Sequence, residues 1–331
     1  MKAFDFIAVG DVVTDAFIKL KDAKVNCNLN EADCTLSLRF GDKVPYESVT
    51  IVKGVGNSPN AAVAAARLGL AAGLVTDLGS DQAGGEIVDY LREQKVSTDY
   101  FTLHSNQPSN YHYVLWYESD RTILVKHEHY NYKWPILNTA PAPKWLYLSS
   151  LGENTNAYHE QILTYLKNNP DVKLAFQPGT YQLKMSEKLK EVYQRAEVVF
   201  MNVEEAKRLL NLETSKIEKL LASLAEWGQS LTVITDGPRG AYLLKNNETW
   251  FMPAYPDPAP PYERTGAGDA FAATFTAALA LGRSPLEALT WAPINSMSVV
   301  QKVGAQAGLL TQKQLLEFLK AAPSDYHAQK I

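Results

Sequence analysis

The chain has 331 residues, of which 46% are hydrophobic and 21% are charged, and its formal net charge is −4. This composition is typical of a soluble globular protein with a sizeable core, either one large α/β domain with an accessory piece or two domains. The acidic balance and the lack of a long basic block argue against a nucleic-acid or membrane partner. No apolar run reaches the roughly 18 residues that a membrane span needs.

The first residues and the cysteines indicate the compartment. The start, "MKAFDFIAVGDVV", carries an acid inside its apolar run and no small-residue cleavage site, so it is typical of a first strand and not of a signal peptide. Cys27 and Cys34 are the only two cysteines. Two cysteines in a chain of this size do not make a disulfide framework, and we expect a reducing, cytoplasmic setting.

Short apolar runs alternate along the chain with helical patterns. Each run ends in small or polar residues, which is typical of buried parallel strands with functional loops at their carboxyl ends. The pattern predicts an α/β fold with a doubly wound, mainly parallel sheet whose ligands gather at those ends. One predicted helix stops at Gly69 and another starts after Asp81 as its N-cap. The predicted strands are "FDFIAVGDV", "AGLVTDLG", "KWLYLSSLG", "VKLAFQPG", "AEVVFMN" and "LTVITDG".

Two segments break this rhythm. Residues 17–52 and 110–130 alternate apolar and polar side chains in the antiparallel manner, the second with a turn near Glu118–Asp120. They predict a small separate sheet, either a lid over the ligand site or a dimer surface. A further hairpin is expected to turn at Asn246–Asn247.

The stretch "YERTGAGDAFAATF", residues 262–275, has the composition of an anion site at the start of a helix. Gly266, Ala267 and Gly268 would offer backbone N–H groups to a phosphate oxygen. Asp269 would lie beside that anion and fits the role of a base that takes a proton from an attacking hydroxyl. Taken alone, the stretch fits equally well a tight turn whose acid complements the helix dipole.

The stretch "RTGAGDAF" resembles the C-terminal signature of the ribokinase-like (PfkB) carbohydrate kinases, usually Asp-Thr-x-Gly-Ala-Gly-Asp. Four further stretches match that family in the right order, so the resemblance covers nearly the whole chain. It implies a single ribokinase-like α/β domain over residues 1–331 with β-insertions as a lid. The four stretches are "GVGNSPNAAVAAARLGL", "TDLGSDQAGGEIVDYLREQKVSTDYF", "NVEEAKRLL" and "ITDGPRGAYLL".

The resemblance also assigns the phosphoryl-transfer residues. Asp269 corresponds to the catalytic base, and Gly266, Ala267 and Gly268 correspond to the anion hole. Asn202 and Glu205 match the Asn-x-x-Glu motif, which helps to organise Mg²⁺ and the phosphates of ATP, Glu205 acting through water. A helix cap followed by a surface acid is the alternative interpretation of that pair.

A second set of matches concerns the nucleotide. Thr235, Gly237 and Gly240 correspond to positions that line the ribose and phosphates. Asn295 and Gly304 would form part of the adenine side, although helical core explains that segment equally well.

The sugar side of the resemblance has matches and departures. Asp15, Gly56, Asn57 and Asn60 would bind the sugar; a strand-end turn is the alternative for Asp15, and an N-cap is the alternative for Asn60. Val55 replaces the first glycine of the usual pair. Glu263 and Arg264 stand where the family has an acid that often supports a monovalent cation, so the use of such a cation is uncertain.

The aromatic and histidine side chains of the second insertion have a simpler interpretation. His127 and His129 are two apart on a predicted strand, so they would face one side. Zinc binding would need a third ligand nearby, and a surface pair on the lid strand is the favoured interpretation.

Together these residues predict an ATP- and Mg²⁺-dependent kinase that phosphorylates a hydroxymethyl group of a ribose- or fructose-like sugar. The alternatives are a nucleoside kinase acting on adenosine or inosine, a sugar-phosphate kinase, and a sugar-binding protein without catalysis. A homodimer through the lid sheet is also expected.

Overall fold

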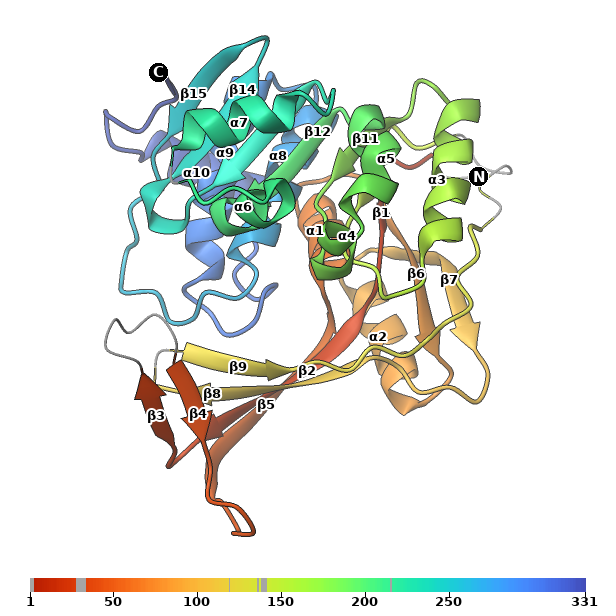
Figure 1. Ribbon diagram of the computed structural model, residues 1–331, viewed down its shortest axis with the longest axis vertical. Coiled ribbons are helices and arrows are strands. Elements are labelled where there is room, and N and C mark those ends of the chain that lie inside the picture. The colour runs from red at the N-terminus through yellow and green to blue at the C-terminus, as the bar shows by residue number, and fades with distance from the viewer. Residues whose placement is uncertain (1–2, 28–33, 119, 136, 138–141, 215) are drawn as a thin grey trace.

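The computed structural model describes residues 3–27, 34–118, 120–135, 137, 142–214 and 216–331 (Figure 1). Its centre is a ten-stranded sheet in the order β16-β15-β14-β13-β12-β11-β10-β1-β6-β7. The strands from β13 to β7 pair in parallel, and β14, β15 and β16 extend that sheet antiparallel. The bounds are β1 Phe6–Val9, β6 Ala72–Gly79, β7 Ser97–His104, β10 Trp145–Leu148, β11 Lys173–Phe176, β12 Val198–Asn202, β13 Leu231–Thr235, β14 Ala241–Lys245, β15 Glu248–Met252 and β16 Gln329–Lys330.

Helices cover both faces of this sheet, which makes it doubly wound as the sequence predicts (Figure 1). Phe6 and Ala8 of β1 belong to one hydrophobic cluster, whereas Ile7 and Val9 belong to the other, because successive side chains on a strand point to opposite faces. Helices α1 (Asn57–Arg67), α2 (Gln82–Glu93), α8 (Ala267–Ala280), α9 (Pro285–Val299) and α10 (Gln312–Lys320) pack into the first cluster. The second cluster takes α3 (Asn156–Asn168), α4 (Thr180–Lys184), η1 (Ser186–Leu189), α5 (Lys190–Arg195), α6 (Val203–Leu210) and α7 (Ile217–Ala225), and the short η2 (Gly237–Arg239) links β13 to β14.

The predicted end of one helix and the predicted start of another are confirmed. Gly69 follows α1 with a φ of 96°, and the Asp81 carboxylate caps α2 by accepting the N–H of Gly84 at 2.9 Å. The hairpin between β14 and β15 turns at Asn246 and Asn247, which both have positive φ. Among the helices of the described residues, none is long and apolar enough to cross a bilayer.

The two predicted insertions meet in a separate four-stranded sheet, in the order β5-β2-β8-β9, and we call it the lid sheet (Figure 1). The β5–β2 and β8–β9 pairs are antiparallel, as expected, but β2 and β8 join them in parallel. The sheet is therefore mixed, because two distant insertions meet side by side. Its strands are β2 Val13–Leu20, β5 Tyr46–Val55, β8 Tyr111–Tyr117 and β9 Asp120–Leu124.

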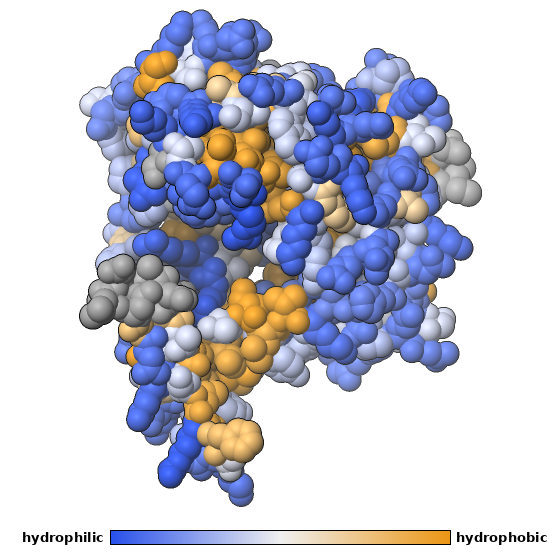
Figure 2. Space-filling view, in the orientation of Figure 1, coloured by the Kyte–Doolittle hydropathy of each residue, from blue (hydrophilic) through white to orange (hydrophobic). Residues whose placement is uncertain are grey.

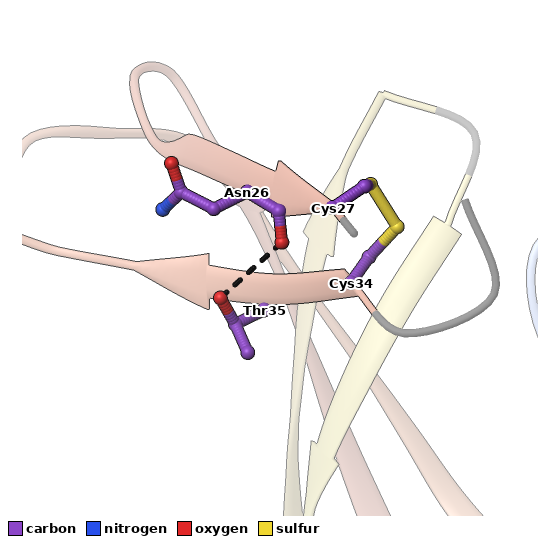
Figure 3. Close-up of a disulfide and its surroundings, with 4 residues drawn as sticks. All are labelled: Asn26, Cys27, Cys34 and Thr35. Atoms are coloured by element: carbon purple, nitrogen blue, oxygen red, sulfur yellow. Dashed lines mark hydrogen bonds between the residues drawn. A yellow bond between two sulfur atoms is a disulfide. The ribbon is translucent and has the colours of Figure 1, made fainter. Parts of the chain in front are cut away.

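A small hairpin between β2 and β5 carries both cysteines. Strands β3 (Lys24–Cys27) and β4 (Cys34–Ser37) pair antiparallel, and their register sets Cys27 opposite Cys34. The two sulfur atoms form a disulfide, close to the hydrogen bond from Thr35 to the Asn26 carbonyl (Figure 3). The sequence argument considered only a framework of several disulfides, and it missed this bond because pairing depends on strand register.

The carboxyl ends of the parallel strands lie along one edge of the main sheet. The chain leaves β1 toward β6 on one side and later returns to β10 on the other, so β1 marks the switch point where such folds bind ligands. Residues at these ends are Asp11 after β1, Gln177 after β11, Asn202 at the end of β12 and Thr235 at the end of β13.

Candidate active site

The first turn of α8 holds the three residues that were predicted to form an anion hole. Gly266 is its N-cap, with φ 79° and ψ 0°, and a Cβ added there would lie 2.3 Å from the Cβ of Ala305. Only glycine fits this position, because the left-handed backbone and the close approach both exclude a side chain. A Cβ on Gly268 would meet no atom within 4 Å, so this turn faces open space. Its N–H groups have no partner inside the helix and carry the positive end of the helix dipole.

Asp269 lies in that same first turn, half-buried, and three side-chain amides donate hydrogen bonds to its carboxylate. Oδ1 accepts Asn57 Nδ2 at 2.9 Å and Gln177 Nε2 at 3.0 Å. Oδ2 accepts Asn60 Nδ2 at 2.7 Å. Asn57 and Asn60 are three apart on α1 and therefore share a face. The structure thus directs toward Asp269 the two amides that the sequence analysis assigned to the sugar.

Asn60 is held in one orientation by a chain of hydrogen bonds. Its Oδ1 accepts Gln306 Nε2 at 2.9 Å, and Gln306 in turn accepts the Tyr90 hydroxyl at 2.8 Å. These contacts require the Nδ2 group of Asn60 to face Asp269. The N-cap alternative for Asn60 is wrong, since α1 begins at Asn57 with Gly56 as its cap.

Burial raises the pKa of Asp269 above its ordinary value, and the hydrogen bonds from Asn60, Gln177 and Asn57 oppose that rise. The Tyr147 hydroxyl donates to Gln177 Oε1, which leaves the Nε2 group to face the carboxylate. Sequence reasoning missed Gln177. The signal was available, because Gln177 is the polar residue that ends the apolar run of the predicted strand VKLAFQPG.

Gln177→Leu tests this arrangement through the pH profile. The substitution removes a donor that stabilises the ionised carboxylate, so the pKa of Asp269 rises further. The role predicted for Asp269 is that of a base, and a base must be deprotonated to act. The acidic limb of kcat/KM should therefore move to higher pH, while activity persists on the alkaline side. The measurement is kcat/KM against pH for wild type, Gln177→Leu and the exposed control Gln194→Leu. An acidic limb that stays at the same pH in all three proteins contradicts the contact.

Asn202 and Glu205 form a reciprocal cap at the start of α6. Asn202 Oδ1 accepts the Glu205 N–H at 2.8 Å, and Glu205 Oε2 accepts the Asn202 N–H at 2.9 Å. The cap interpretation is therefore correct for the backbone. Glu205 is nevertheless half-buried: burial raises its pKa, the hydrogen bond with Asn202 lowers it, and the nearby charge of Asp269 raises it again.

The environment of Glu205 is better suited to a bound cation than to an unpaired carboxylate. The cap uses Oε2 of Glu205, which leaves Oε1 for a water or an ion. A positive charge between Glu205 and Asp269 would offset their mutual repulsion.

The predicted nucleotide residues fall into two groups. Thr235 ends β13 and pairs in register with Asn202, so it lies at the ligand edge of the sheet, and Gly237 follows with open space beside it. Gly240 has a structural task, because a Cβ there would lie 2.3 Å from the carbonyl oxygen of Met252.

Two further residues that were predicted to bind the nucleotide make close contacts with other parts of the protein. Asn295 is fully buried; its Nδ2 donates to Thr274 Oγ1 at 2.8 Å, and its Oδ1 accepts the Leu310 N–H at 2.9 Å. Asn295 therefore ties α9 to α8, which is the helical-core alternative. At Gly304 a Cβ would lie 3.2 Å from Val52 of the lid strand β5, so this residue lies against the lid.

The remaining predicted residues lie on the lid sheet or close to it. Asp15 Oδ1 lies 3.4 Å from His112 Nδ1, and Gly56 has a φ of 121°, with a carbonyl oxygen of Asp11 2.9 Å from where its Cβ would be. Glu263 is buried and accepts the N–H groups of Thr265 at 2.9 Å and Gly304 at 3.3 Å.

The prediction of a surface histidine pair is wrong. Residues 125–130 do not form a strand, so the alternation that would set His127 and His129 on one face is absent. His127 has only 16% of its side chain exposed, and its Nδ1 lies 3.5 Å from Asp11 Oδ2.

The fold is shared with solved sugar kinases. The ribokinase of Arabidopsis thaliana, whose structure is described as a complex with ribose and ATP, superposes with a TM-score of 0.77 over 96% of this chain and 99% of that one, at 20% identity. The class of protein is therefore a ribokinase-fold α/β protein with a lid.

The sequence comparisons identify the family. The pattern of the pfkB family of carbohydrate kinases matches residues 23–312, and the chain belongs to that family. It is an ATP-dependent carbohydrate kinase. It is similar to the ribokinase of Bacillus subtilis, at 27% identity over 85% of this chain and 92% of that protein. It is also similar to the 5-dehydro-2-deoxygluconokinase of Bacillus velezensis, at 23% identity over 98% and 96% of the two chains.

Proposed function

We propose that this kinase transfers the terminal phosphoryl group of ATP to a hydroxymethyl group of a small ribose- or fructose-like sugar, with Asp269 as general base. The observation that carries the proposal is the position of Asp269, held by three amides in the open first turn of α8. A raised pKa makes the carboxylate a better proton acceptor near neutral pH.

The other parts of the site supply what an alcohol needs to attack a phosphate. The N–H groups of Gly266, Ala267 and Gly268 stabilise charge on the transferring phosphoryl oxygens. Thr235, which pairs in register with Asn202 at the ligand edge of the sheet, and Gly237 would line the nucleotide. Glu205, through water, and Asn202 would help to hold Mg²⁺, which would supply positive charge that offsets the negative charge of the phosphates. Transfer is direct and in line, so no residue carries the phosphoryl group.

The lid sheet covers the sugar. In Figure 2 the surface is hollowed between the lid sheet and the rest of the molecule. Asp15 and His112 are paired in register and lie on the inner face of the lid sheet. In this proposal, residues 1–331 act as one catalytic domain. Closure of this sheet over the sugar excludes water and limits hydrolysis of ATP.

The outer face of the lid sheet supports a homodimer. Val49 and Ile51 of β5, Tyr113 of β8 and Leu124 of β9 are 44%, 53%, 48% and 50% exposed, and their register brings them to one face. Figure 2 shows apolar side chains along these strands. An exposed apolar face of this kind favours association with a second copy, which sedimentation velocity measures directly.

The cytoplasm remains the proposed compartment. The Cys27–Cys34 disulfide joins two neighbouring strands of an exposed hairpin. It departs from the reduced cysteines expected in such a compartment, where disulfides are rare.

The experiment is ADP release with Mg²⁺ and ATP against a panel: ribose, fructose, 2-keto-3-deoxygluconate, fructose 6-phosphate, ribose 1-phosphate, adenosine and inosine. We expect strong turnover with a free sugar and a low background without one. Faster turnover of adenosine or inosine than of every sugar contradicts the proposed substrate and favours a nucleoside kinase.

A further inference from the structure

Glu263 is a buried acid that ties together two loops beside the first turn of α8, and its side chain is 7% exposed. Its Oε2 accepts the N–H of Thr265 at 2.9 Å, directly before the N-cap Gly266. Its Oε1 accepts the N–H of Gly304 at 3.3 Å. The two loops also pack against each other, because a Cβ on Gly266 would lie 2.3 Å from the Cβ of Ala305. Glu263 therefore fixes the chain that leads into the proposed anion hole.

The lid sheet reaches this acid through β8 and β9. Nη1 of Arg121, on β9, lies 3.8 Å from Oε2 of Glu263. Trp116 of β8 is paired in register with Arg121, and residues directly opposite each other on antiparallel strands share a face. The ring of Trp116 is 5.5 Å from the ring of Tyr262, which precedes Glu263. Two neighbouring lid residues therefore contact two consecutive residues at the entry to α8.

The charge of Glu263 needs an opposite charge at this position. A buried carboxylate that accepts only backbone N–H groups keeps its full negative charge, which would repel phosphates bound at the turn that follows. The guanidinium of Arg121 is protonated at every working pH and is only 26% exposed, so water screens its charge less than at an open surface. The chain neighbour Arg264 is exposed and acts on another acid: burial raises the pKa of Asp257, and the charge of Arg264 lowers it.

A monovalent cation fits poorly beside Glu263. Both of its carboxylate oxygens already accept N–H groups, and the guanidinium of Arg121 faces one of them. A metal cation in contact with that oxygen would lie close to the positive guanidinium and would be repelled. The acid that often supports such a cation in the family is thus present here with an arginine as its counter-charge.

We propose that Arg121 is a positioning residue that acts through Glu263: it supplies the positive charge beside the proposed anion hole, so that this kinase needs no monovalent cation. The same contact makes the first turn of α8 depend on the lid sheet, because β9 delivers the guanidinium. The inference rests on the proposed function, since it describes the surroundings of the proposed anion hole.

The first part of the test is the response of the wild-type protein to cations. Turnover of the best sugar should be the same in the chlorides of K⁺, Na⁺ and tetramethylammonium at equal ionic strength. The midpoint of thermal unfolding, Tm, gives a second readout that needs no substrate, because an ion that binds the folded state raises Tm. A saturable rise in kcat or in Tm that is specific to K⁺ overturns the inference.

The second part removes the guanidinium with Arg121→Ala. We expect kcat to fall by about 10- to 100-fold, the cost of a small misplacement of positioned groups. KM for the sugar should change little, because the proposed anion hole acts on the transition state. Arg39→Ala is the matched control, since Arg39 lies between β4 and β5 with its side chain 86% exposed, and it should keep full activity.

Two further readouts distinguish a charge from simple packing of the lid. Arg121→Lys keeps the positive charge and should keep most of the wild-type kcat. Guanidinium ion at a low, non-denaturing concentration should restore part of the turnover that Arg121→Ala loses. A raised KM for the sugar with unchanged kcat, or no response to guanidinium ion, would mean that Arg121 only packs the lid.

Glu263→Gln identifies the partner through which Arg121 acts. Once the carboxylate charge is gone, the guanidinium has nothing to offset, so adding Arg121→Ala to Glu263→Gln should lower kcat little further. Losses that multiply in the double variant contradict the coupling. Where Glu263→Gln does not fold, the guanidinium rescue and the cation series decide.

The outcomes separate this inference from the proposed function. Activation of wild type by K⁺, or a wild-type kcat in Arg121→Ala, overturns the inference and leaves the proposed function standing. Faster turnover of a nucleoside than of every sugar overturns the proposed substrate alone, and the variants are then measured with that nucleoside. Absence of turnover with every substrate overturns the proposed function, and the effect of K⁺ on Tm then decides the inference by itself.

Discussion

Asp269→Asn is expected to lower kcat by about 10²- to 10⁴-fold while the Kd for ATP stays nearly the same, because the substitution removes the proposed general base and leaves the proposed anion hole in place. The amide is neutral and cannot take the proton of an attacking hydroxyl. Its NH₂ group would also face one of the donors from Asn57, Asn60 and Gln177. The measurement is steady-state turnover with saturating sugar, together with calorimetric titration of ATP.

Asp325→Asn is the matched control, since Asp325 is an exposed acid near the end of the chain, and it should keep full activity. Asp269→Asn with more than a tenth of wild-type kcat would mean that another group accepts the proton.

Gly266→Ala is expected to lower both stability and activity. The added Cβ meets Ala305 at 2.3 Å, and φ is 79°. A left-handed non-glycine residue costs about 1–2 kcal/mol, and forced overpacking adds about 1–3 kcal/mol. The free energy of unfolding should therefore fall by about 2–5 kcal/mol, and kcat should fall because the first turn of α8 shifts. Chemical denaturation and turnover measure the two effects.

Gly268→Ala separates the steric effect from the chemistry. Its Cβ meets no protein atom within 4 Å, so the free energy of unfolding should stay close to that of wild type. A rise in KM for ATP in this variant would indicate that the added methyl group obstructs the open space in front of the turn. Equal destabilisation by the two substitutions would contradict the assigned packing of Gly266 against Ala305.

Most of the fold could be predicted from sequence features that involve neighbouring residues. Apolar runs with small or polar ends marked β1, β6 and β10 to β13, and Asp81 and Gly69 marked helix ends. Such features depend on neighbours a few residues away, so one sequence displays them. The Asn202–Glu205 cap is readable for the same reason, because its partners are three residues apart.

Side-chain contacts between residues far apart in the sequence could not be predicted from local patterns. Asn57 bonds to Asp269 across 212 positions and Tyr132 bonds to Asp11 across 121. Nothing in a local pattern indicates which face of the sheet these residues reach or how strands β2 and β8 align. The roles of Asn57 and Asn60 toward Asp269, the contact between Arg121 and Glu263 and the Cys27–Cys34 pairing all depend on that alignment.

The most direct test of the central claim is to follow the best sugar substrate by ³¹P and ¹H NMR during turnover with Mg²⁺ and ATP. Asp269 acting on a hydroxymethyl group predicts one phosphomonoester on that carbon for each ADP formed. ADP and inorganic phosphate without a sugar ester, or a phosphate on another oxygen of the sugar, would contradict it.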